Sequence, residues 1–183
     1  MTQLIPQVLS VLVVGSNVLF IIALALFAFS DPVRAWIVNS ISRHGTWYVF
    51  VLSVTATIGS LALSNVVGFS PCDLCWVQRL FMYPQAVIAA VVLARRKGGE
   101  ISKRVVYGLL TLSVSGLLIA LYHSYSQWGG EKSLLPCVAD GGACGKLYIY
   151  AYNYVTIPFM ALSVFIYLTA VLLIALFVVR KEK

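Results

Sequence analysis

Long apolar runs fill most of the chain, and the charged residues fall almost entirely between them. A helix needs about 20 mostly apolar residues to cross the hydrocarbon core of a bilayer. The pattern predicts five such helices, at residues 8–29, 47–69, 76–94, 105–125 and 155–179. Of the connections between them, only residues 126–154 form a long one. We therefore expect an all-α membrane protein with five transmembrane helices in a single integral membrane domain, residues 1–183.

The composition also indicates that a bilayer surrounds this chain. It is 61% hydrophobic and 10% charged, with a mean hydropathy of +0.93. A soluble domain is closer to half apolar and about a quarter charged. The first apolar run, residues 8–29, could alternatively be a cleaved signal peptide. Residues 1–7 carry no Lys or Arg, however, and the run is longer than the apolar core of a signal peptide. We expect residues 8–29 to remain as a transmembrane helix.

The net charge of +7 is distributed unevenly over this topology. If the five helices alternate in direction, ten of the 13 Lys and Arg residues lie on one side: Arg34, Arg43, Arg95, Arg96, Lys97, Lys103, Arg104, Arg180, Lys181 and Lys183. The other side carries Lys132 and Lys146, with Arg79 at the start of the third helix. Because cytoplasmic loops are enriched in Lys and Arg, the N-terminus is expected outside and the C-terminus in the cytoplasm. The basic excess is a topology signal rather than a sign of nucleic-acid binding.

The cysteines are the main candidates for chemistry: Cys72, Cys75, Cys137 and Cys144. All four fall on the outer side of the predicted topology, where disulfides persist. Four cysteines allow three connectivities, and sequence alone does not choose among them. Pairing within each local pair, 72 with 75 and 137 with 144, is our default.

Two alternatives to redox chemistry remain open for these cysteines. Disulfides could merely brace the outer loops, although the spacing of Cys72 and Cys75 closes a loop too small to remove much chain entropy. Strained or exposed bonds of this kind are the labile ones. Four thiolates could instead bind zinc, but structural zinc sites usually combine two short hairpins, and the 137–144 spacing is long. We favour thiol–disulfide exchange.

The first pair stands at the predicted start of the third transmembrane helix. Backbone N–H groups and the positive end of the helix dipole favour a thiolate there, and reactive cysteines occupy such places. Polar or sulfur-bearing residues follow at three- and four-residue steps: Cys75, Gln78, Arg79, Met82 and Gln85. They share one helix face, which must point into the bundle rather than to lipid.

Arg79 and His123 are candidates for binding an electron acceptor. A charge at membrane depth is costly by a few kcal/mol and by default indicates function, the alternative being a side chain that reaches to the interface. Arg79 lies about 6 Å of helix rise beyond Cys75, where a cation would stabilise a thiolate and charge developing on an acceptor. His123 lies at a similar depth in the fourth helix. A structural histidine, hydrogen-bonded to backbone or water, is the alternative there.

Residues 71–79, PCDLCWVQR, resemble the P-C-x-L-C-x-x-Q/E-R motif of the disulfide-bond-formation protein B (DsbB) family. His123, the loop cysteine pair and residues 157–159, IPF, support the likeness, which covers roughly residues 47–180. The resemblance implies a four-helix bundle core over residues 47–180. It further implies a dithiol:quinone oxidoreductase that uses ubiquinone or menaquinone to generate disulfides de novo and to reoxidise a DsbA-like thioredoxin-fold partner.

The resemblance also implies a role for each site residue. Cys137 would form the mixed disulfide with the partner, Cys144 would pass electrons to Cys72, and Cys75 would be the thiolate that faces the quinone. A second set would hold the quinone head group: Arg79, His123 and Gln78. The location implied is a bacterial cytoplasmic (inner) membrane, in contact with its lipid and quinone pool, with all four cysteines outside the cytoplasm.

Two features depart from the family pattern. The span at residues 8–29 lies outside the four-helix core, and the 137–144 loop is short, as in the compact Bacillus-type BdbC branch. A vitamin-K-epoxide-reductase-like quinone/thiol oxidoreductase is one alternative, but there the loop pair precedes the membrane CxxC, the reverse of the order here. A non-enzymatic membrane protein with bracing disulfides is the other.

Overall fold

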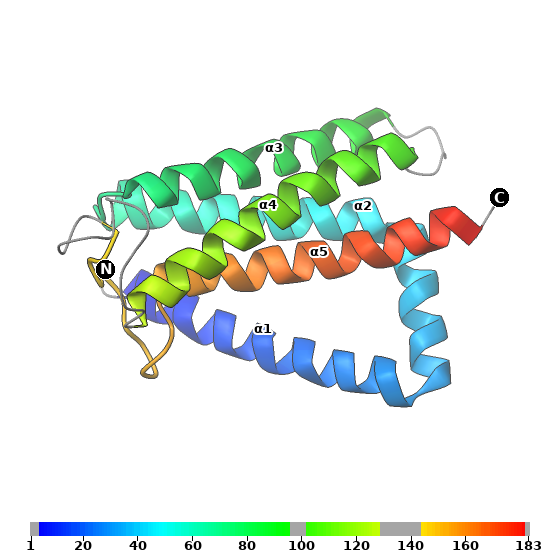
Figure 1. The fold of residues 1–183 in the computed structure, drawn as a ribbon, viewed down its shortest axis with the longest axis horizontal. Coiled ribbons are helices and arrows are strands. Elements are labelled where there is room, and N and C mark those ends of the chain that lie inside the picture. The colour runs from blue at the N-terminus through cyan, green and yellow to red at the C-terminus, as the bar shows by residue number, and fades with distance from the viewer. Residues whose placement is uncertain (1–3, 96–101, 129–143, 182–183) are drawn as a thin grey trace.

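The computed structural model describes residues 4–95, 102–128 and 144–181, and five long helices account for most of them (Figure 1). They are α1 (Leu4–Phe29), α2 (Asp31–Leu61), α3 (Asp73–Arg95), α4 (Lys103–Gln127) and α5 (Ile157–Lys181). All five are long and apolar enough to cross a membrane. The predicted all-α class and the five membrane-spanning helices are therefore confirmed.

The connection between the first two helices differs from the prediction. We expect a loop over residues 30–46, yet α2 begins at Asp31, so only Ser30 separates it from α1. Ser30 is extended, at φ −127° and ψ 108°, and Pro32 follows in the first helical turn, where its missing N–H is harmless. The first turns of α2 run across the end of the bundle before the helix enters it (Figure 1). A helix can thus form there without the apolar run that a membrane crossing needs.

The main core lies between α2, α3, α4 and α5. Its buried apolar side chains come from all four helices: Val49, Met82, Ala89, Val106, Leu109, Ala120, Leu162, Phe165, Leu168, Leu172 and Leu176. Helices α4 and α5 pack closely at Gly116, where an added Cβ would collide with the ring of Phe165. Small residues of this kind let membrane helices approach each other. Among the described residues, none from α1 belongs to this core.

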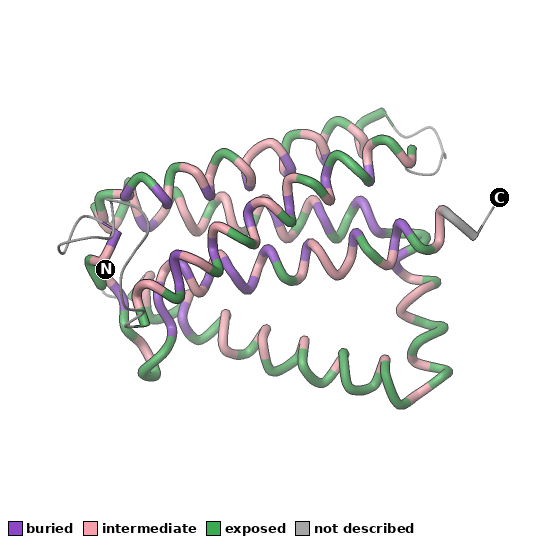
Figure 2. Tube along the Cα trace, viewed as in Figure 1, coloured by how far each residue is buried: buried purple, intermediate pink, exposed green. Residues whose placement is uncertain are grey.

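Helix α1 lies beside the four-helix bundle. Its only buried residue is Ser10, and Figure 2 shows most of the helix as exposed or half-buried. Ile5, Leu9, Val13 and Val14 pack against a second apolar cluster, at the end of the bundle where α3 begins. Towards its other end α1 diverges from α5 (Figure 1). Contact between α1 and the bundle is therefore concentrated at the end that carries the first cysteine pair.

The chain reaches α3 through an irregular segment. Helix α2 continues into a π-helical turn, Ala62–Val66, and Gly68 then takes a positive φ of 83°, which favours glycine. Thr156 precedes the last helix, and the N–H of Phe159 lies 3.4 Å from its side-chain oxygen. Both segments lie at the same end of the bundle, so the irregular backbone gathers where the cysteines are (Figure 1).

Candidate active site

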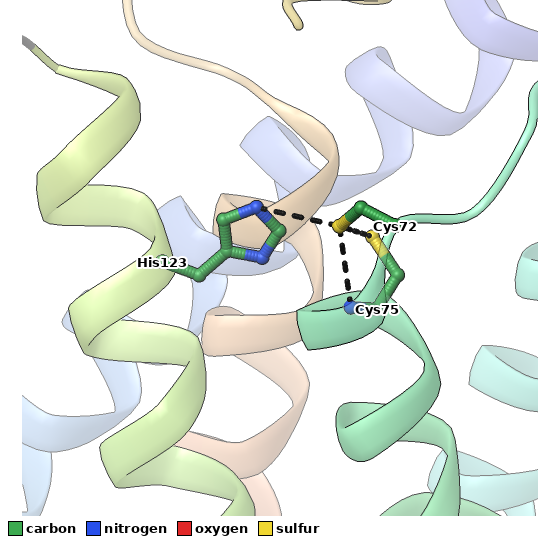
Figure 3. A group of neighbouring side chains, drawn as sticks. All are labelled: Cys72, Cys75 and His123. Carbon is green, nitrogen blue, oxygen red and sulfur yellow. Dashed lines mark hydrogen bonds between the residues drawn. The ribbon is translucent and has the colours of Figure 1, made fainter. Parts of the chain in front are cut away.

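The first cysteine pair occupies the start of α3. Cys72 precedes the helix and Cys75 lies in its first turn, with 2.8 Å between their sulfur atoms (Figure 3). The backbone N–H of Cys75 donates to the Cys72 sulfur at 3.4 Å, as it would to the side chain of a helix-capping residue. Both cysteines are free, so the disulfide predicted between them is not formed in this structure. The pair is described in its reduced form.

Cys72 carries the negative charge of the reduced pair. The Cys75 thiol, followed by His123 and the Cys75 backbone N–H, stabilises the thiolate, while burial acts in the opposite direction. Together they lower the pKa of Cys72 from 9.0 to about 4. Because the thiolate is the nucleophilic form of cysteine, Cys72 is the reactive member of the reduced pair at neutral pH. The family resemblance implies a thiolate at Cys75, a role that therefore needs Cys72 to be engaged elsewhere.

His123 connects the two cysteine pairs. It lies fully buried on α4, and its Nε2 atom lies 3.8 Å from the Cys72 sulfur (Figure 3). The same atom lies 3.2 Å from the carbonyl oxygen of Cys144. The amide nitrogen of Gln78 lies 3.3 Å from its Nδ1 atom. An amide nitrogen can only donate, so Nδ1 accepts and the ring proton sits on Nε2, facing Cys72 and Cys144.

Cys144 is the described member of the second pair. It is fully buried and disulfide-bonded, whereas Cys137 lies outside the described residues. Cys144 packs in one small apolar cluster with Cys72 and Leu74. Its carbonyl also accepts a hydrogen bond from Gln127 at 3.0 Å. Two side chains of α4 thus hold this cysteine against the first pair.

Arg79 is fixed by α2. Its Nε donates to the Ser60 hydroxyl at 2.9 Å and its Nη2 to the Ser60 carbonyl at 3.0 Å. The guanidinium also lies 5.1 Å from the centre of the Trp76 ring. Arg79 is therefore half-buried and held against α2.

A cavity of about 400 Å³ lies beside the first pair. All five helices contribute to its lining, α4 through Gln127, and the lining side chains are mainly apolar. From the start of α3 and its polar face it receives Cys72, Cys75, Gln78, Arg79 and Met82. Of the three residues expected to hold an acceptor, Arg79 and Gln78 line this cavity. His123 is not among its lining residues and contacts Cys72 and Cys144 instead.

The spacing of the same groups differs from that of a tetrahedral zinc site. Ligand atoms of Cys72, Cys75 and His123 lie within 4.8 Å of one another. Two thiolates on a tetrahedral zinc ion stand roughly 3.7 Å apart, given Zn–S bonds of about 2.3 Å. The observed 2.8 Å between the two sulfur atoms is too short for that arrangement. Cys144 is disulfide-bonded and so does not supply a fourth thiolate.

Two residues of this site escape sequence reasoning. Gln127 follows His123 by four residues and so shares its helix face, a signal that could have been used. Ser60 lies on another helix, and nothing in the sequence pattern connects it to Arg79.

The comparison with known families decides where the chain belongs. The profile of the family described as "Disulfide bond formation protein DsbB" matches residues 42–179. The chain belongs to the DsbB family. The match includes all four cysteines, Arg79 and His123, and it leaves α1 outside. This DsbB-family protein therefore has a role in disulfide bond formation.

Several relatives of this DsbB-family chain carry names of the same kind. Disulfide bond formation protein C of Bacillus subtilis is 36% identical over 124 residues, 67% of this chain and 83% of that protein. Probable disulfide formation protein C of Bacillus cereus is 36% identical over 136 residues, 72% and 88% of the two chains. A probable disulfide formation protein of Deinococcus radiodurans is 36% identical over 97 residues, 53% and 60% of the two. No solved structure matches this chain significantly.

Proposed function

We propose that the protein is a dithiol:quinone oxidoreductase of a bacterial cytoplasmic membrane, which reoxidises a DsbA-like thioredoxin-fold partner. One observation carries the proposal: the Cys72–Cys75 pair lies between two different environments. On one side Cys72 contacts His123 and the cluster that includes Cys144. On the other side the pair lines an apolar cavity that also contains Arg79. A dithiol placed there can pass electrons from protein thiols to an acceptor dissolved in the membrane.

The cavity fits a quinone head group in size and chemistry. Its volume of about 400 Å³ is typical of small-molecule sites, and its lining is mainly apolar, as a flat hydrophobic ring requires. Ser60 uses two of the five N–H donors of Arg79, which leaves donors for a carbonyl oxygen. A bound quinone would supply an acceptor for two electrons and two protons.

The redox state of the described cysteines corresponds to one stage of this reaction. Cys144 is disulfide-bonded while Cys72 and Cys75 are free, the arrangement expected once the first pair has received the electrons. In the preceding stage a thiol pair of the partner would reduce the 137–144 disulfide and leave oxidised. The Cys144 thiolate would then attack Cys72, break the Cys72–Cys75 disulfide and release the Cys75 thiolate. Attack of Cys137 on Cys144 would release Cys72 and restore the 137–144 disulfide. Oxidation of the first pair then removes two electrons and two protons, forms the bond between the two sulfur atoms and completes the cycle.

His123 and Arg79 would stabilise negative charge at different places, His123 at Cys72 and Arg79 at Cys75 and the acceptor. His123 directs its Nε2 proton at the side of Cys72 that meets the second pair, and it lowers the pKa of Cys72 as a leaving group. While Cys72 is bonded to Cys144, the charge of the first pair falls to Cys75. Arg79, one helical turn further along, then stabilises that thiolate and orients the acceptor beside it. Cys75 thereby obtains the acceptor-facing role that the family resemblance implies.

The proposed orientation places the N-terminus and all four cysteines outside the cytoplasm and the C-terminus inside. The excess of Lys and Arg on one side supports it. A membrane-impermeant maleimide should label Cys72, the reactive member of the reduced pair, in intact cells but leave a cysteine introduced at Lys183 unlabelled. The reverse pattern would overturn the orientation.

The function is tested with the purified full chain, reduced thioredoxin-fold oxidase as electron donor and a quinone as acceptor. Wild type should reduce the quinone, Cys75→Ser should be inactive, and Arg79→Gln should raise the quinone KM more than it lowers kcat. Arg34→Gln is the matched control, because it removes an exposed cation that pairs only locally with Asp31. Wild-type protein that is folded but reduces no quinone, or Cys75→Ser protein with full turnover, would refute the proposal.

A further inference from the structure

Helix α1 is joined to α5 by hydrogen bonds in the middle of an apolar surface. Asn17 donates to the Ser163 hydroxyl at 3.1 Å, and the Tyr167 hydroxyl donates to the Asn17 side-chain oxygen at 2.5 Å. Ser16 lies 3.1 Å from the same Tyr167 hydroxyl. We call these four residues the α1–α5 network. In lipid such polar groups strongly favour a protein partner, so the network fixes α1 at this height on α5.

The part of α1 on the cysteine side of this network lines the cavity beside Cys75. Its contribution is Leu9, Leu12, Val13 and Ser16. Across from α1, the lining on α3 extends from Cys72 to Tyr83, which is about 17 Å of helix rise. Polar groups of α3 concentrate at one end of that length, around Arg79. The cavity therefore resembles a site for a molecule with a polar head and an apolar extension.

We infer that α1 forms the wall of the acceptor site that contacts the isoprenoid side chain of the quinone. This inference rests on the quinone proposed above as acceptor. With the head group between Cys75 and Arg79, the first units of the side chain would lie along Leu9, Leu12 and Val13. The residues matched by the family profile begin at 42, so this wall is supplied by a helix outside the matched region.

The wall acts through packing. An isoprenoid chain is as apolar as the surrounding lipid, so burying it against α1 gains little hydrophobic energy. Close contact with fixed side chains still selects the shape of the chain and restricts its movement. Substitutions in α1 should therefore affect quinones with a side chain and leave quinones without one almost unchanged.

Photolabelling gives a readout that is independent of activity. The full chain would be incubated with a quinone that carries a diazirine on its first isoprenoid unit, irradiated, and mapped by mass spectrometry. We expect labelled residues within 9–16, and we expect unlabelled quinone to compete. Leu12→Trp should reduce this labelling about fivefold, a loss typical of removing one packed contact.

Leu19→Trp is the matched control. Leu12 and Leu19 lie two turns apart on the same helix face and are similarly exposed, at 61% and 69%, but only Leu12 lines the cavity. Tyr167→Phe removes a hydroxyl of the α1–α5 network while keeping the ring that packs at a tilt against Phe20, and it should also weaken α1 labelling. In steady-state assays Leu12→Trp should raise the KM for an isoprenoid quinone but not for a quinone without a side chain.

The outcomes separate the inference from the proposed function. Wild-type protein that reduces quinone but carries label only on α2–α5 would overturn the inference and leave the function intact. Label on α1 that unlabelled quinone does not displace, and that a photoreactive phospholipid reproduces, would show a lipid at this wall and would also overturn it. Wild-type protein that neither binds nor reduces a quinone would refute both.

Discussion

Replacing Cys75 by Ala should move the titration of Cys72 upward by several pH units. The hydrogen bond from the Cys75 thiol is the largest cause of the low pKa of Cys72, which is about 4 in the reduced protein. His123 contributes less, so His123→Ala should shift the pKa of Cys72 in the same direction but by a smaller amount. Leu80→Ala, one turn along α3 and 66% exposed, is the control that should change nothing.

The size of the expected change in the pKa of Cys72 decides whether a rate at one pH or a full pH profile must be measured. If the pKa of Cys72 returned to about 8.5, its thiolate fraction at pH 6 would fall from about 99% to roughly 0.3%. The more basic thiolate is intrinsically more nucleophilic, with a Brønsted slope of about 0.4–0.5, which compensates by roughly 100-fold. The alkylation rate at a single pH would therefore fall only about threefold. The midpoint of the pH profile of the alkylation rate, in contrast, moves by the whole change in the pKa of Cys72.

The assay is the rate of iodoacetamide alkylation of Cys72 between pH 3 and 10, followed by mass spectrometry of the peptide. A wild-type midpoint near the ordinary cysteine value, or a Cys75→Ala midpoint equal to that of wild type, would refute this account of the pair. Protein stability gives a second check on the sign. Since folding depresses the pKa of Cys72, its stabilising contribution is complete above about pH 9 and is lost as the pH falls towards 4.

Two further predictions concern packing and the second cysteine pair. Gly116→Ala should destabilise the bundle by about 1–3 kcal/mol, because its Cβ would overlap the Phe165 ring, whereas a Cβ at Gly108 meets nothing within 4 Å. Thermal unfolding in detergent would measure both, and Phe165→Leu should restore part of the loss; equal effects at the two glycines would contradict the packing argument. Gln127→Ala should slow turnover with the thioredoxin-fold donor about fivefold, since it removes a hydrogen bond to the Cys144 carbonyl. Turnover with a small dithiol that reduces the first pair directly should fall less, and an equal loss with both donors would show that Gln127 acts mainly at the cavity, which it also lines.

Hydropathy predicted the membrane-spanning helices well because the bilayer requires a minimum length of apolar chain. It failed at residues 30–46, which form the beginning of α2 rather than a loop. A helix that runs across the end of the bundle need not be apolar along its whole length, so its sequence gives no membrane-crossing signal. Local turn chemistry, with Ser30 followed by Asp31 and Pro32, is the signal that indicates a helix start there.

The site was predictable along each helix but not between helices. Helical spacing placed Gln78 and Arg79 on the same face as Cys75, and they do line one cavity. The depth of His123 could also be read from its helix. The residues that His123 contacts could not be read from the sequence, because they depend on how α4 is rotated about its own axis. A mostly apolar helix carries little information on that rotation. The contacts of His123 with Cys72 and Cys144 are therefore visible only in the structure, and its role at the acceptor stays a prediction.

The sulfur of Cys72 caps α3, and in the proposed reaction it also exchanges electrons, so the redox state of the pair would be linked to the order of a backbone turn. A charged sulfur accepts the Cys75 N–H and meets the positive end of the α3 dipole. A sulfur in a disulfide is neutral, so the first turn of α3 loses a contribution of about 1 kcal/mol that a good cap provides. Each catalytic cycle would then loosen and tighten the start of α3. The rate of amide hydrogen exchange at the first residues of α3 would therefore report whether the Cys72–Cys75 pair is reduced or oxidised.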